Sequence, residues 1–190
     1  GSTWATRVAR VSASATPTVV ATTVDTITQL PRIAAGDGGL CAVMGRFGFQ
    51  PMATMLSFAG TPTVVKAAFA LGGELSQYGH DVAMRDDGEW VAAWEETGAT
   101  SDIILQRYSA VGDPIGSALY AQQGNNDFGG KQPRVDYSAA GHVAVAWPDK
   151  QRVLYQGYDA TGGELFSGAV QVNGLSTQMP DDVSVGMAPD

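Results

Sequence analysis

The chain has few cysteines, few lysines and no long apolar run, and each shortage excludes a class of protein. A single cysteine, Cys41, stands among 190 residues, so no internal disulfide can form. Its place in an alternating apolar run predicts a small buried side chain. Lysine occurs only three times and the formal net charge is −8, so the chain lacks the basic stripe of a nucleic-acid-binding protein. No apolar run reaches membrane-spanning length, and we expect no membrane insertion.

Catalytic patterns are also missing. There is no Gly-x-Ser-x-Gly elbow and no set of histidine, aspartate and serine whose context indicates a triad. His80 and His142 have no partner at metal-ligand spacing, so we expect neither zinc nor another cofactor. These absences favour a protein without enzymatic activity. A glycan-directed hydrolase stays an alternative, because Glu95, Glu96 and Asp149 offer the carboxylates that such an enzyme uses in pairs.

What the chain does have is an internal repeat. The sequence of residues 80–123 is repeated, with substitutions, in residues 133–173. Val82, Trp90 and Trp94 correspond to Val135, Val143 and Trp147, each 53 residues later. The later positions align at an offset of 50, and the three-residue difference falls in the loop after the tryptophan. Length variation confined to a loop is expected of copies that share one strand framework.

Within each copy the apolar residues alternate, which predicts β-strands. Trp90, Ala92 and Trp94 share one face of a strand. Glycine turns, such as those at Gly88, Gly112 and Gly162, mark hairpins. About four short strands in each unit of roughly 50 residues is the spacing of β-propeller blades. We therefore predict an all-β propeller of four-stranded up-and-down blades, with complete blades at residues 32–79, 80–132 and 133–180.

The two ends of the chain match parts of a repeat. Residues 9–17 align with the later half of a copy and residues 181–190 with its opening strand. We therefore predict a single propeller domain over residues 1–190, with a fourth blade shared by residues 1–31 and 181–190. Two alternatives stay open: the chain is part of a longer protein, or two chains pair their open ends as a homo-oligomer.

The repeat resembles one found in large secreted and surface proteins of bacteria. Those repeats carry a strand that ends in tryptophan, a Gln-Arg-Tyr-x-Ala-x-Gly strand and turn, and a closing Gln-Val-Asn. The matching residues here are 91–94, 106–112, 143–147, 158–162 and 171–173. The resemblance implies a propeller-type fold and a secreted or cell-surface location, and it implies no activity.

Four loops are candidates for a binding site, since in an up-and-down blade they emerge at one mouth of the ring: residues 95–101, 123–132, 148–151 and 173–180. Trp94 and Trp147 end equivalent strands beside two of these loops, where they either pack between blades or stack on a sugar ring. The polar candidates for ligand binding are Glu95, Asn125, Asn126, Asp127 and Asp149. Oxygens of residues 125–127 also offer a site for calcium, although the strict calcium-loop pattern is missing.

These observations predict an extracellular binding or adhesion module that recognises a carbohydrate or a protein at one mouth of the propeller. The alternative from another class is a structural module that assembles by pairing its open terminal strands with other chains.

Overall fold

The computed structural model describes residues 5–11, 19–24, 27, 29–72, 79–97, 100–125, 131–172 and 183–188. Within these ranges the chain forms β-strands and the turns that join them, with one short 3-10 turn at Asp37–Gly39. The predicted all-β class is therefore confirmed. None of the helical structure in these ranges is long and apolar enough to span a membrane.

The strands of the described ranges form four antiparallel sheets, each built from consecutive strands. The short sheet pairs β1 (Thr6–Val11) with β2 (Val19–Val24). Sheet I contains β3 (Gln29–Ala35), β4 (Leu40–Phe47), β5 (Gln50–Ser57) and β6 (Thr63–Ala70). Sheet II contains β7 (His80–Met84), β8 (Trp90–Thr97), β9 (Ser101–Tyr108) and β10 (Pro114–Asn125). Sheet III contains β11 (Arg134–Tyr137), β12 (Val143–Asp149), β13 (Arg152–Tyr158) and β14 (Val170–Gln171). The predicted up-and-down four-stranded units are thus present.

The second strand of each large sheet is buried on both faces. In β8, Trp90, Ala92 and Trp94 belong to a core that also contains residues of sheet I. The alternate residues Val91 and Ala93 belong to a second core, shared with sheet III. The shared face that the alternation predicted for the first three residues is confirmed. Because an apolar side chain of this size contributes about 1.5–3 kcal/mol when fully buried, the two faces of β8 hold sheet II between its neighbours.

Tight turns with glycine in the left-handed region close the hairpins at one end of the sheets. The amide of Gly88 donates to the carbonyl of Arg85, and that of Gly141 donates to Ser138, each at 3.0 Å. The φ angles of these glycines are 89° and 87°, a conformation that strains any residue with a Cβ. Gly112 and Gly162 make the same turn, so the hairpins predicted from glycine are confirmed.

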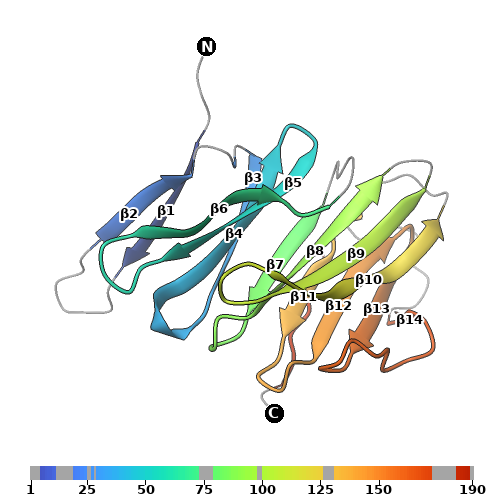
Figure 1. Cartoon of the computed structure of the whole chain (residues 1–190). Coiled ribbons are helices and arrows are strands. Elements are labelled where there is room, and N and C mark those ends of the chain that lie inside the picture. Colours follow the sequence, from blue (N-terminus) through green and yellow to red (C-terminus); the bar gives the residue numbers. More distant parts are fainter. Residues whose placement is uncertain are drawn as a thin grey trace.

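Figure 1 shows the sheets following one another in chain order, from the short sheet in dark blue to sheet III in orange. The first strands β3, β7 and β11 lie next to one another in this series. Two ends of the array can then be distinguished. The turn end carries the turns that follow β3, β7 and β11 (residues 36–39, 85–89 and 138–142). The loop end is where β7 and β11 begin and where β8 and β12 end.

The described parts of the two chain ends lie in different places. The short sheet has only β1 and β2 among the described residues. Residues 183–188 lie beside β11, where the amide of Met187 donates to Asp136 Oδ2 at 2.6 Å. The shared fourth blade and the count of four blades therefore stay predictions.

The packing between sheets II and III gives a stability prediction. Val135 is buried in their shared core, so Val135→Ala should lower the free energy of unfolding by about 1–3 kcal/mol through lost burial and a residual cavity. Val111 is 56% exposed, and Val111→Ala should change it by less than about 0.5 kcal/mol. Urea denaturation of both variants checks this expectation, and equal losses would contradict it.

Candidate functional site

The two tryptophans that the sequence proposed for ligand binding lie inside the protein. Trp94 is buried in the core between sheets I and II, and Trp147 in the core between sheets II and III. The indole N–H of Trp147 donates to Gln122 Oε1 at 2.7 Å. In this structure neither ring presents a face to solvent on which a sugar could stack. Their place favours the packing interpretation over the binding one.

The two proposed carboxylates at the loop end are also buried and are engaged within the chain. The hydroxyl of Ser101 donates to Glu95 Oε1 at 2.6 Å. Burial raises the pKa of Glu95, while the Ser101 hydroxyl and the buried Lys131 oppose that rise by favouring the charged form. Asp149 is equally buried and forms an ion pair with Arg152. Both carboxylates are therefore enclosed at the loop end and engaged by residues of the chain itself, and neither is presented to a ligand.

The asparagine-rich loop that the sequence proposed for a ligand or calcium lies almost entirely outside the described residues. Of the three proposed residues 125–127, only the backbone of Asn125 is described, at the end of β10, where it pairs in register with Ser101. Asn126 and Asp127 lie outside the described residues. In the part of the chain that is described, no group of three histidine, cysteine, aspartate or glutamate side chains could hold a metal ion. The calcium proposal stays a prediction.

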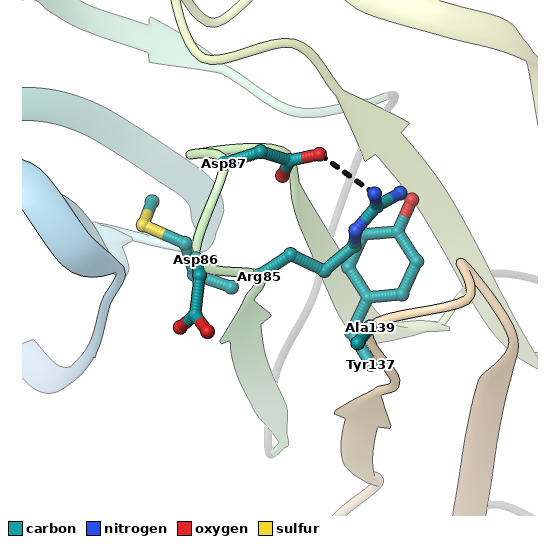
Figure 2. A pocket seen from close by; sticks show the side chains of 6 residues that line it. Arg85, Asp86, Asp87, Tyr137 and Ala139 are labelled. Carbon is teal, nitrogen blue, oxygen red and sulfur yellow. Dashed lines mark ion pairs between the residues drawn. The ribbon is translucent and has the colours of Figure 1, made fainter. Parts of the chain in front are cut away.

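A pocket of about 330 Å³ opens at the turn end, opposite to the loops that the sequence proposed. Figure 2 shows it between the turn after β7 and the end of β11. Its lining combines apolar, aromatic and charged side chains from two successive sheets: Met84, Arg85, Asp86, Asp87, Tyr137 and Ala139. The pocket is thus a feature of the contact between sheets II and III.

An arginine and a tyrosine in the pocket lining contact each other and share a carboxylate partner. The guanidinium of Arg85 pairs with Asp87 at 2.7 Å and with Glu89 at 3.0 Å, and it lies 5.4 Å from the centre of the Tyr137 ring. The Tyr137 hydroxyl donates to the same Glu89 carboxylate at 3.2 Å. Burial raises the pKa of this phenol. Arg85 of sheet II is therefore fixed in orientation by partners on both sheets, which is how a binding site is pre-organised.

Asp86 is the charged group of the pocket that these contacts leave available. Its side chain is exposed, and Figure 2 shows its carboxylate turned away from Arg85. An exposed carboxylate accepts hydrogen bonds from hydroxyl or amine groups of a ligand without a large desolvation cost.

Sequence reasoning identified residues 86–88 as a turn and missed the site that they border. A signal was present, because the corresponding turn of sheet III has Ser138, Ala139 and Ala140 where sheet II has Arg85, Asp86 and Asp87. The turn of sheet I has Gly36, Asp37 and Gly38 at these places, so Arg85 and Asp87 are charged only in sheet II and cannot serve the shared framework. What the sequence alone does not show is that Tyr137, 52 residues after Arg85, lies against this turn in the folded chain.

His80 is a second titratable group that the fold places unusually. It begins β7 at the loop end and is buried, and its Nε2 donates to the carbonyl of Leu30 at 2.7 Å. This bond leaves Nδ1 as the unprotonated nitrogen, and Nδ1 has no hydrogen-bond partner in the described structure. Burial lowers the pKa of His80 to about 4, with further lowering by the charges of Arg32, Arg46 and Arg134.

No protein-family model and no curated protein matches the chain. Among solved structures, the chain is similar to the crystal structure of a protein from Lactobacillus plantarum, with a TM-score of 0.52 and 11% sequence identity. The match covers 88% of this chain and 52% of that protein, so the chain spans about half of its neighbour's length. At this identity the likeness concerns the fold alone. With the up-and-down four-stranded sheets, it defines a repeat protein of the propeller type.

The neutral His80 predicts a pH dependence of stability. Its pKa in the folded chain lies below the ordinary 6.5, so the unfolded state binds more protons between pH 6.5 and about 4. Stability should fall as the pH falls through this window, by up to about 1.4 kcal/mol per pH unit from this residue. His80→Gln should flatten that slope in urea denaturation at several pH values, with His142→Gln as the matched control. An unchanged slope in His80→Gln would refute the assignment.

Proposed function

We propose that this chain is a binding module that takes a carbohydrate at the turn-end pocket of Met84, Arg85, Asp86, Asp87, Tyr137 and Ala139. The observation that carries the proposal is the combination of an aromatic ring, a fixed guanidinium and an exposed carboxylate around one opening. Sugars present hydroxyl groups that both donate and accept, beside apolar C–H faces. Asp86 accepts from such hydroxyls and Met84 offers apolar surface, while Tyr137, itself largely buried, orients the Arg85 guanidinium at the opening.

The size of the pocket supports a small ligand over a protein partner. A volume of about 330 Å³ lies at the lower end of the range for small-molecule sites, which is about 300–1,000 Å³. A stable protein interface instead buries about 800 Å² on each partner, so a protein would have to contact much more than this pocket. We therefore favour one or two sugar units over a protein as the occupant.

A secreted or cell-surface location, and a role in adhesion, complete the proposal. They rest on the resemblance of the repeat, through residues such as 91–94 and 106–112, to repeats of bacterial secreted and surface proteins. The acidic, lysine-poor composition is in keeping with that setting. A binding module of this kind would hold its ligand at the turn end while the packed sheets act as a rigid support.

Asp86 provides the test, because its exposed side chain contributes little to folding. Asp86→Ala should weaken carbohydrate binding by tenfold or more, since a hydrogen bond to a charged group contributes about 1.5–3 kcal/mol. Asp37→Ala is the matched control, because Asp37 is an exposed residue at the corresponding place in the turn of sheet I. A glycan array identifies a bound sugar, and titration calorimetry then compares the variants with the unmodified chain.

Two outcomes would contradict the proposal. One is the absence of any retained glycan on an array that includes both neutral and acidic sugars. The other is an equal loss of affinity in Asp86→Ala and Asp37→Ala, which would place the site elsewhere on the turn end.

A further inference from the structure

One face of sheet I is uncovered where the other sheets are covered. Ile33 in β3, Val82 in β7 and Val135 in β11 occupy the same position of the repeat. Val82 and Val135 are each 6% exposed, because the preceding sheet lies over them, whereas Ile33 is 54% exposed. The contact between sheets that buries Val82 and Val135 is therefore absent at Ile33 in the described structure.

Grooves mark the place of the missing contact. Two of them, of about 260 and 290 Å³, run between β1 and β3, and both are lined by Val8, Ala9 and Ile33. β1 pairs with β2 along one edge, and in the described structure its other edge carries no strand. An extended segment lying beside β1 would both extend the short sheet and cover Ile33.

The opposite end of the array carries the complementary half of the contact. Residues 183–188 lie against β11 in the place of a next first strand, anchored by the amide of Met187 on Asp136. Val183, Val185 and Met187 are half-buried, whereas Ser184, Gly186 and Ala188 are exposed. This segment therefore has one face on sheet III and one face free.

One residue of the free face, Ser184, is small, like the residues that make this contact from sheets I and II. Ala34 packs into the core that contains Val82, and Ala83 packs into the core that contains Val135. Ser184 corresponds to these positions in the last copy of the repeat, and it is exposed. Each contact between sheets thus brings a small residue of one first strand against a larger residue of the next first strand. In the proposed contact, Ser184 is the small residue and Ile33 is the larger one.

We propose that the chain associates head to tail with a second copy, residues 183–188 of one copy lying between β1 and β3 of the other. The chain's own segment lies against β11, which is separated from β3 by β7, so it covers a different first strand. Both halves of the interface are surfaces that this chain already joins between its own consecutive sheets. The contact is heterologous, since different patches of the two copies meet.

Association tests the surface. The chain should show a mass above that of one copy, rising with concentration, in size-exclusion chromatography with light scattering. Ile33→Glu should weaken association by tenfold or more, since it places a charge where an apolar side chain is to be buried. Val111→Glu is the control, because Val111 is 56% exposed on a turn of sheet II, away from both halves of the contact. A single-copy mass at all concentrations, or equal effects of the two variants, would overturn the proposal.

Cysteine pairing tests the register and separates two copies from one. Cys41 is buried and lines one of the grooves, so both variants are made in a Cys41→Ala chain, in which a disulfide can form only between the introduced cysteines. Ile33→Cys and Ser184→Cys, in separate chains that are mixed and oxidised, should form a disulfide-linked dimer, since pairing needs Cα atoms within about 7 Å. A dimer that each variant forms equally well alone would overturn the proposal. So would a double variant that closes only within one chain. Neither experiment uses the turn-end pocket, so carbohydrate binding is tested independently.

Discussion

The contact of one sheet face with the face of the next sheet is the constraint on which the rest of this structure depends. β8 shows why, since Trp90 and Trp94 face sheet I and Val91 and Ala93 face sheet III. A strand that is apolar on both sides leaves its sheet with two faces that water must not reach. A four-stranded sheet that contains such a strand is therefore stable only where a neighbouring sheet covers each of its two faces.

The same constraint divides scaffold from site. Side chains on the second strands, β4, β8 and β12, are committed to the contacts between sheets, and even polar ones are enclosed, as Glu95 is with Ser101 and the buried Lys131. The turns at the ends of the sheets carry side chains that this packing does not use. At the turn end, the left-handed glycine turn fixes the backbone by itself, so residues 85–87 are free to carry charge. A site at this end exploits the precise spacing of two packed sheets without weakening either of them.

Sequence patterns were sufficient for the strands and insufficient for the turn-end pocket, for reasons that particular residues make clear. Alternation at Trp90, Ala92 and Trp94 indicated which side chains share a face, because period two is a local property of a strand. Alternation cannot show that both faces are covered, so the pattern alone cannot reveal that the ligand-binding candidates Trp94 and Glu95 are buried. The pocket needed knowledge of which turn lies next to Tyr137, and that depends on the stacking of whole sheets. The shared blade likewise depended on where residues 183–188 lie, which no local pattern reports.

The uncovered face of β3 can be compared with the covered faces of β7 and β11, which hold the same position of the repeat. Ile33 is as apolar as Val82 and Val135, yet only Ile33 stands in solvent, at a cost of about 1 kcal/mol or more relative to burial. Exposed apolar side chains occur singly on many surfaces and then need no explanation. Here the exposed residue lies at a position that is buried in the other two copies, beside two grooves and the edge of β1 to which no strand of the described residues pairs. Sheets II and III show what covers this position when it is covered, and the proposed contact with a second copy uses the same arrangement.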